Sequence, residues 1–262
     1  MPSDMNPTAA VVPEPGQSYS EAFYDAQQQG SRHSAAVVVP LVLEAFPVRS
    51  VIDVGCGVGG WLAEFRRRGV EDVLGVDGDY VPRDALKIPV DRFEARDLRR
   101  YAGPERRFDL ACSLEVAEHL PAEVADGFVA ALVRAAPVVL FSAAVPGQGG
   151  TSHVNEQWQS YWFARFAAHG YACLDLVRPR VFEDDRVEWW YRQNALVFCE
   201  PQRHPESAAA ISTAYELDRV HPALLAARSN DGRPRSGREA VASIVENVGY
   251  LGTAFKRRIG AD

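Results

Sequence analysis

The sequence predicts an α/β fold, in which a doubly wound, mostly parallel sheet is covered by helices on both faces. Short segments rich in apolar and β-branched residues alternate with longer segments whose apolar residues recur at helical spacing. The strand-like segments are apolar almost throughout, which is typical of parallel strands buried on both faces. With 262 residues, of which 47% are apolar, the chain is long enough for one such domain with extensions.

The first half of the chain supplies most of this alternation. A helix is expected over residues 35–46, with Ser34 as its N-cap and Pro40 dividing it into two pieces. A strand over 50–54 and a glycine-rich turn lead into a helix over 61–68. Further strands are expected over 72–76, 108–114 and 138–143, and a further helix over 122–135. Ligands of such sheets bind at the carboxyl ends of the strands.

The second half completes the sheet and adds an extension. After a glycine-rich loop, Asn155 is expected to cap a helix that carries Trp158 and Trp162 and ends at Gly170. Strands over 172–182 and 188–199 are expected to form an antiparallel hairpin at the sheet edge. The predicted organisation is therefore a flexible tail over 1–18, a catalytic domain over 19–200 and a helical C-terminal extension over 201–262.

Composition narrows the classes of partner. The net charge is −7, which argues against nucleic acid as a ligand. The four cysteines form no CxxC pair, and the N-terminus lacks the pattern of a signal peptide. No apolar stretch is long enough to span a membrane. These features predict a cytoplasmic protein, and an amphipathic run over 241–255 suggests docking onto its own domain or onto a second subunit as a homodimer.

The glycine-rich turn carries the first chemical signal. Gly55, Gly57 and Gly60 match the GxGxxG pattern of dinucleotide sites. Asp53, however, precedes the first glycine by two residues, where it would repel a pyrophosphate. S-adenosylmethionine has an ammonium and a sulfonium and no phosphate, so it suits this acid better. Asp77, at the end of the next strand, is placed to accept hydrogen bonds from ribose hydroxyls.

These motifs resemble those of class I S-adenosylmethionine-dependent methyltransferases, which have a Rossmann-like fold. The resemblance covers roughly residues 30–200 and rests on four segments in order, which are Asp-Val-Gly-Cys-Gly-Val-Gly at 53–59, Gly-Val-Asp at 75–77, Arg-Asp-Leu at 96–98 and Phe-Asp-Leu at 108–110. It implies a seven-stranded sheet with six parallel strands and one reversed strand. It also implies that Asp53 and Gly55 face the methionine part, Asp77 the ribose, and Asp97 with Leu98 the adenine.

An acid-histidine cluster follows the fourth expected strand. Glu115, Glu118 and His119 would share one face of a helical turn. The resemblance places the loop 147–157, which carries His153 and Glu156, beside this turn. Such a set of carboxylates and imidazoles is compatible with a divalent cation, namely Mg, Mn, Fe, Co or Zn. The pattern is similar to that of metal-dependent small-RNA 2′-O-methyltransferases and ubiquinone-pathway O-methyltransferases, but the same turn also occurs in methyltransferases without a metal.

The sequence therefore predicts an O-methyltransferase acting on a hydroxyl of a small-molecule or glycan acceptor. A hydroxyl needs a Lewis acid or a base near neutral pH, and without a metal His119 or His153 is the candidate general base. The alternatives are N-methylation of a small-molecule amine, an NAD-dependent oxidoreductase and a non-catalytic binding protein. Aromatic residues of 158–162 and 189–191 are candidates for the acceptor pocket, whereas His169, His204 and His221 are expected to face solvent.

Overall fold

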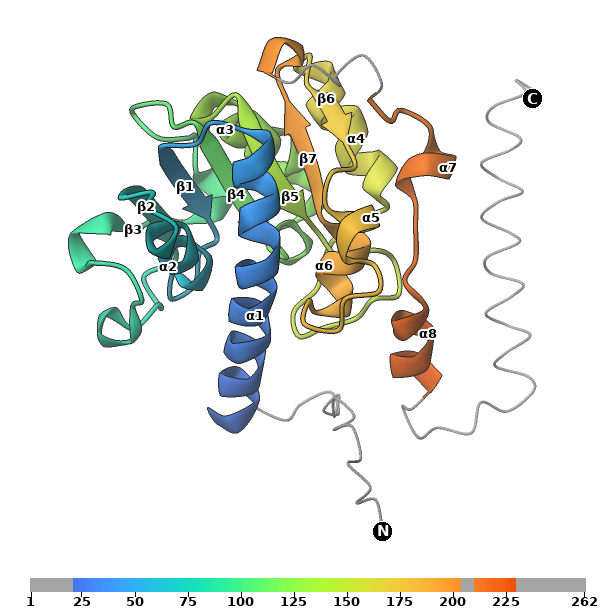
Figure 1. Cartoon of the computed structure of the whole chain (residues 1–262), viewed down its shortest axis with the longest axis horizontal. Helices are drawn as coiled ribbons and strands as arrows, with labels where there is room; N and C mark the ends of the chain where they lie inside the picture. The colour runs from blue at the N-terminus through green and yellow to red at the C-terminus, as the bar shows by residue number, and fades with distance from the viewer. Residues whose placement is uncertain (1–20, 204–209, 230–262) are drawn as a thin grey trace. The chain divides into compact units, whose positions relative to one another are not determined.

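The computed structural model describes residues 21–203 and 210–229 (Figure 1). The predicted tail, the amphipathic run over 241–255 and His204 lie outside these residues. The described residues up to Leu224 belong to one compact unit, and residues 225–229 belong to another. In the described part, no helix is both long enough and apolar enough to cross a bilayer.

A seven-stranded sheet in the order β3-β2-β1-β4-β5-β7-β6 forms the centre of the fold. Its strands are β1 Ser50–Val54, β2 Asp72–Asp77, β3 Phe93–Ala95, β4 Leu110–Leu114, β5 Val138–Ser142, β6 Ala172–Leu174 and β7 Leu196–Cys199. Neighbours pair in parallel from β3 to β5, whereas β7 is antiparallel to both β5 and β6. Six strands therefore run one way and one is reversed, which confirms the predicted fold class.

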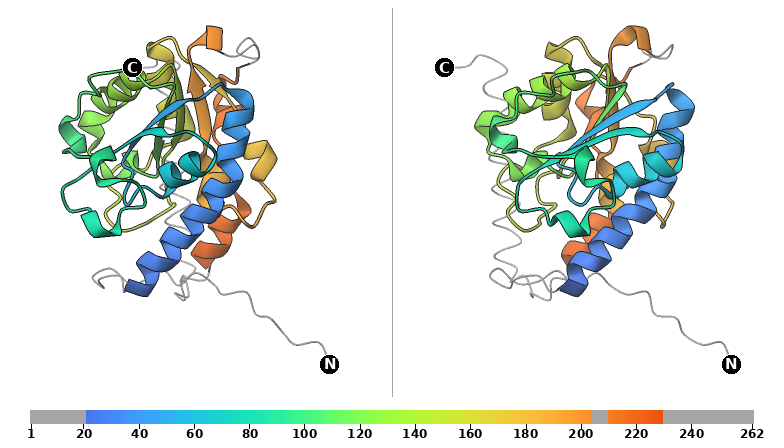
Figure 2. Two further views of the ribbon diagram at one scale, coloured as in Figure 1. Left: turned by 60° about the vertical axis from the view of Figure 1, so that its left-hand side comes forward. Right: turned by 90° about the vertical axis from the view of Figure 1, so that its left-hand side faces the viewer.

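Helices cover both faces of the sheet (Figures 1 and 2). The longer helices are α1 Glu21–Ala45, α2 Gly60–Arg67, α3 Ala125–Ala135, α4 Gln159–Ala168 and α8 Pro222–Ser229, and the shorter ones are α5 Arg178–Val181, α6 Trp189–Asn194 and α7 Ala214–Leu217. Val51 of β1 belongs to the core shared with α1 and α2. Ile52, which points to the opposite face, belongs to the core shared with α3 and α4. Strands buried on both faces explain the nearly unbroken apolar pattern.

Three predictions about local structure are wrong. Helix α1 begins at Glu21 and continues through Pro40, so Ser34 is not an N-cap. The Ser34 hydroxyl instead donates to the Gly30 carbonyl and accepts from the Glu188 amide, which ties α1 to the start of α6. Asn155 does not cap α4, which begins at Gln159. The amide of Asn155 donates to the Glu118 carbonyl in a loop that precedes the helix.

The predicted edge hairpin is also wrong in its extent. Strands β6 and β7 do pair antiparallel, but they contain three and four residues, and α5 and α6 lie between them. The segment 188–194 is aromatic and β-like in composition, yet it folds as α6 and packs Tyr191 against Trp61 of α2. Tertiary packing outweighs strand propensity here. His221 is buried with Nε2 2.9 Å from the Phe182 carbonyl oxygen, so it does not face solvent.

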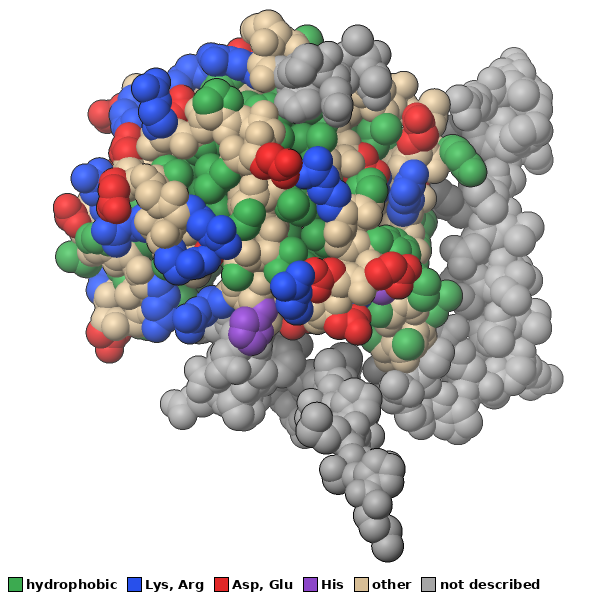
Figure 3. Space-filling model, in the orientation of Figure 1, with side chains coloured by type: hydrophobic (Ala, Val, Ile, Leu, Met, Phe, Trp, Pro, Cys, Tyr) green, Lys and Arg blue, Asp and Glu red, His purple; other side chains and the backbone are tan. Residues whose placement is uncertain are grey.

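Charged side chains of both signs are interspersed over the surface seen in Figure 3. Several arginines have acidic partners close in sequence or space. On α2 and just beyond it, Glu64 pairs with Arg67 and Arg68. At the start of β2, Asp72 pairs with Arg106, which precedes β4. These pairs balance the local charge of the arginines, and each exposed pair contributes little to stability.

Candidate functional site

Most of the residues singled out by the sequence lie at the carboxyl ends of β1, β2, β4 and β5. Four connections meet there, namely the glycine loop after β1, the segment after β2, the turn after β4 and the loop after β5. Because β1 and β4 are adjacent in the centre of the sheet, their loops face each other. This is the edge at which open α/β sheets bind ligands.

The glycine loop is held close to the sheet by backbone hydrogen bonds. The amides of Gly55 and Cys56 donate to the Val76 carbonyl, and the Gly57 amide donates to Asp77 Oδ2 at 2.7 Å. Gly55 has a φ of 90°, and a Cβ there would lie 2.3 Å from a methyl carbon of Val116. Conformation and space therefore both require glycine at position 55.

Substituting Gly55 by alanine is expected to destabilise the protein by about 2–5 kcal/mol, because the left-handed backbone and the contact with Val116 both oppose a side chain. Gly69 is a matched control, since its φ is 92° and a Cβ there would meet open space. Gly69→Ala is expected to cost only about 1–2 kcal/mol. Urea denaturation of both variants measures the difference, and equal losses would show that the contact with Val116 is unimportant.

Asp53 is a buried carboxyl without a hydrogen-bond donor among the described residues. It is 2% exposed, and burial together with the negative charge of Asp77 raises its pKa to about 8. Asp77 is 4% exposed and well partnered by comparison. Its Oδ1 accepts from the Gly78 amide at 2.6 Å and from the Tyr80 hydroxyl at 2.5 Å. A cation beside Asp53 would give its carboxylate a partner and would offset the repulsion between Asp53 and Asp77.

Unlike Asp53 and Asp77, Asp97 and Leu98 are not buried. Both follow β3, next to the end of β2, where Asp97 is exposed and caps a short 3₁₀ turn at Leu98–Arg100. Its carboxylate accepts two hydrogen bonds from the Arg99 guanidinium, which lower its pKa. An adenine contact at this position stays a prediction.

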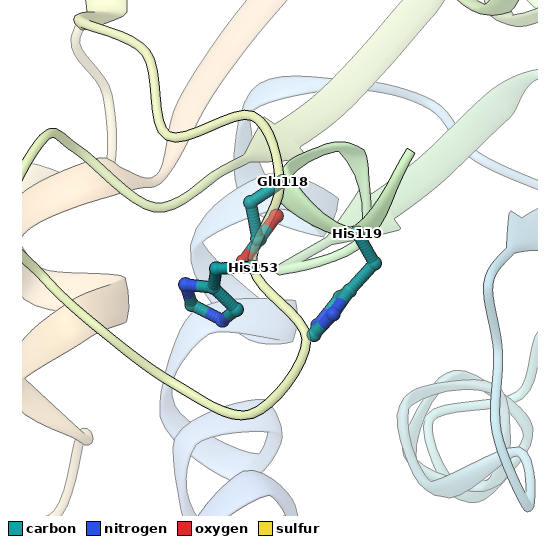
Figure 4. Close-up of side chains that lie close together, drawn as sticks. All are labelled: Glu118, His119 and His153. Atoms are coloured by element: carbon teal, nitrogen blue, oxygen red, sulfur yellow. The ribbon is translucent and has the colours of Figure 1, made fainter. Parts of the chain in front are cut away.

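The turn after β4 and the loop after β5 bring three of the predicted metal ligands together (Figure 4). One ligand atom each from Glu118, His119 and His153 lies within 4.8 Å of the others. The two imidazole rings meet edge to face with their centroids 4.8 Å apart. The amides of Val154 and Asn155 both donate to the Glu118 carbonyl, which fixes His153 beside the turn.

Glu115 does not join this group of three. It adopts a φ of 56°, and its carboxylate accepts from Gln148 Nε2 at 2.7 Å and from Asn194 Nδ2 at 3.2 Å. The predicted shared face fails because the turn is a 3₁₀ helix over Ala117–His119 that begins only after Glu115. Gln148 and Tyr80 were not predicted as site residues, because single amide and phenol side chains in loops give no sequence signal.

Burial shapes the electrostatics of the cluster. Glu118 is fully buried, and neither carboxylate oxygen has a well-formed hydrogen bond within the described chain. Burial and the nearby charge of Glu115 raise its pKa well above the usual range. Burial and the neighbouring His153 lower the pKa of His119, which favours its neutral form. Although burial opposes it, hydrogen bonds from His153 and two glycine amides lower the pKa of Glu156.

These residues fit a divalent cation. A buried carboxylate without a partner, beside two imidazoles, is costly unless a proton or a cation satisfies it. A neutral imidazole is the form that binds a metal. Glu118, His119 and His153 would hold the ion. One carboxylate with two histidines suits Mn, Fe, Co or Zn better than it suits Mg or Ca, which prefer oxygen ligands.

The comparisons with known proteins agree with this reading of the fold. The sequence profile of a family described as "Methyltransferase domain" matches residues 24–190. No curated protein matches the chain. Among solved structures, DesVI of Streptomyces venezuelae has a TM-score of 0.52 at 17% identity, with 68% of this chain and 95% of that chain covered.

Two further solved structures are similar at lower scores. A SAM-dependent methyltransferase from Archaeoglobus fulgidus has a TM-score of 0.49 at 16% identity, with 69% of this chain and 99% of that chain covered. Magnesium protoporphyrin IX methyltransferase from Synechocystis PCC 6803, solved with bound SAM, has a TM-score of 0.47 at 17% identity, with 70% and 85% covered. The match over residues 24–190 and the seven-stranded sheet show that this chain belongs to the class I S-adenosylmethionine-dependent methyltransferases.

Proposed function

We propose that this methyltransferase transfers the methyl group of S-adenosylmethionine to a hydroxyl oxygen of a polar acceptor. The observation that carries the proposal is the buried Glu118 carboxylate, which lacks a well-formed hydrogen bond and lies beside His119 and His153. N-methylation of a neutral amine needs little activation, so it would not call for this group of residues. A hydroxyl is almost wholly protonated near neutral pH and needs a Lewis acid or a base.

The donor would lie between the glycine loop and the two buried acids. Asp53 would face the ammonium, Gly55 and Gly57 would allow the donor to approach the backbone, and Asp77 would accept from the ribose hydroxyls. Tyr80 would have to move, because its hydroxyl already occupies one oxygen of Asp77. Membership in the methyltransferases favours this use of Asp53 and Asp77 over nicotinamide chemistry.

The acceptor would lie over the cluster that follows β4 and β5. A divalent cation bound there would lower the pKa of the acceptor hydroxyl and orient its oxygen. The chain's own residues supply one carboxylate and two imidazoles for that task. Helix α6 borders this region, because its last residue, Asn194, contacts Glu115. The half-buried rings of Trp189 and Trp190 on α6 suit a sugar or a natural-product ring with polar edges.

The proposal is tested by removing and replacing the metal. We expect turnover of hydroxyl acceptors to fall at least 100-fold after complete chelation with EDTA, and to return with Mn, Co or Zn. His119→Ala and His153→Ala are expected to lose activity to a similar extent while binding S-adenosylhomocysteine normally. His169→Ala is the matched control, because His169 is exposed at the end of α4. Mass spectrometry of the product measures turnover.

The possible outcomes separate the alternatives. Unchanged turnover after chelation would remove the metal from the mechanism and leave His119 or His153 as the candidate base. Methylation of amines but not of hydroxyls, with little effect of either alanine substitution, would favour an N-methyltransferase.

A further inference from the structure

Glu156 lies in the loop after β5 and accepts three hydrogen bonds. Its Oε2 accepts from the Gly147 amide at 2.8 Å, and its Oε1 accepts from the Gly149 amide at 2.6 Å. The third partner is His153, whose Nδ1 lies 2.9 Å from Oε1. The side chain of Glu156 is only 19% exposed. One carboxylate therefore joins the two ends of this loop.

The loop has a backbone that needs such a clamp. Gly147, Gly149 and Gly150 all have positive φ values, and Ser152 has a φ of 62°. Glycines lose much conformational freedom on ordering, and a left-handed serine adds strain. Hydrogen bonds among the described residues offset this cost. They include the bonds from two glycine amides to Glu156 and the bonds from the Val154 and Asn155 amides to the Glu118 carbonyl.

The contact with Glu156 also sets which nitrogen of His153 is free. A carboxylate beside Nδ1 favours the neutral tautomer with its hydrogen on Nδ1. Nε2 then keeps its lone pair. The ring packs so closely on Gly150 that a Cβ there would lie 2.3 Å from Nε2. The ring of His153 is thus held on one side by Glu156 and on another by the glycine backbone.

We propose that Glu156 is the positioning residue for His153, fixing its ring and its Nδ1–H tautomer so that Nε2 is the nitrogen left to act with Glu118 and His119. This inference rests on the proposed function for its purpose, because a histidine ligand must present a free nitrogen in a defined direction. Glu156 is not one of the three residues whose ligand atoms lie within 4.8 Å of one another.

The test compares Glu156→Ala and Glu156→Gln with the wild-type full chain. Cobalt titration followed by visible absorption, and zinc titration by calorimetry, measure metal affinity. We expect Glu156→Ala to weaken both about 10–100-fold. Glu156→Gln keeps an oxygen that can accept from His153, so a smaller loss is expected. Binding of S-adenosylhomocysteine is expected to stay unchanged and reports that the domain is folded.

Glu216 provides a matched control. Its carboxylate also closes a loop, accepting from the backbone amide and hydroxyl of Thr213, but it belongs to α7. Glu216→Ala is expected to leave metal affinity unchanged. Wild-type affinity in Glu156→Ala would overturn the proposal.

A second readout does not depend on the metal. Long-range ¹H–¹⁵N spectra of the imidazoles are expected to show the Nδ1–H tautomer of His153 in the wild-type protein and in Glu156→Gln, and to lose it in Glu156→Ala. If the wild-type protein bound no metal, the metal in the proposed function would fail, and these spectra would still decide the role of Glu156. An Nε2–H tautomer in the wild-type protein would overturn it.

Discussion

Asp53→Asn is expected to abolish methyl transfer and to raise the melting temperature of the free protein. At pH 7.5 the folded chain must keep a carboxyl whose pKa is about 8 in a buried position without a hydrogen-bond donor, whereas the unfolded chain ionises it freely. Asparagine removes this mismatch with almost no change in volume. We expect a gain of at least about 1 kcal/mol, which corresponds to about 2–4 °C for a chain of this size.

The same substitution removes the charge that would meet the donor's ammonium in the proposed site. We expect the affinity for S-adenosylhomocysteine to fall at least 100-fold, the scale of a lost charge-assisted contact in a buried site. Differential scanning fluorimetry and isothermal calorimetry on the same samples measure the two effects. A variant that is less stable, or that binds the cofactor product normally, would contradict the role of Asp53.

Asp109→Asn is the matched control for stability. Asp109 lies just before β4, and its Oδ2 accepts from the amides of Arg49 and Ser50 and from the Ser50 hydroxyl. An amide cannot accept all three bonds at that atom in the same way. We therefore expect Asp109→Asn to lower the melting temperature and to leave cofactor binding intact, which is the opposite of Asp53→Asn in both respects.

The sequence predicts the sheet well, because the signal for a buried strand is local. Val51 and Ile52 point to opposite faces and are both fully buried, so the segment 50–54 is apolar and β-branched without help from the rest of the chain. The structure after residue 172 is predicted wrongly because it depends on contacts with residues far away in the sequence. Its aromatic residues suit a strand, but Tyr191 is packed against Trp61 from α2, which only the tertiary structure brings near.

The candidate site likewise combines residues linked by local spacing with residues that only the tertiary structure brings together. Asp53, Gly55 and Asp77 follow a spacing within one strand-helix-strand unit, and the structure places them together at the ends of β1 and β2. Glu118 and His153 are 35 residues apart and meet through bonds from two loop amides to one carbonyl. The predicted position of Glu115 is wrong because it depends on a helical turn, whereas Glu115 has a φ of 56° and its side chain contacts Asn194.

Cofactor binding is expected to weaken as the pH falls below 8. In the free protein Asp53 is protonated below a pKa of about 8, and it must release this proton to meet a cation. Well below that value each unit of pH lowers the affinity for S-adenosylhomocysteine about tenfold, so that binding at pH 6 is roughly 50-fold weaker than at pH 8, where half of Asp53 is already ionised. Near pH 7, calorimetry in two buffers of different ionisation enthalpy is expected to detect release of about one proton.

The stability of the free protein is expected to change in the opposite direction. An acid whose pKa rises on folding stabilises the folded state while it is protonated, and this contribution is lost as the pH rises from about 4 toward 8. Asp53→Asn removes both dependences at once, which separates them from the titration of His119. Asp77→Asn is expected to lower the midpoint of the affinity curve, because the charge of Asp77 is one of the two causes of the raised pKa of Asp53. An affinity that is constant between pH 6 and 8 in the wild-type protein would show that Asp53 does not meet the positive end of the donor.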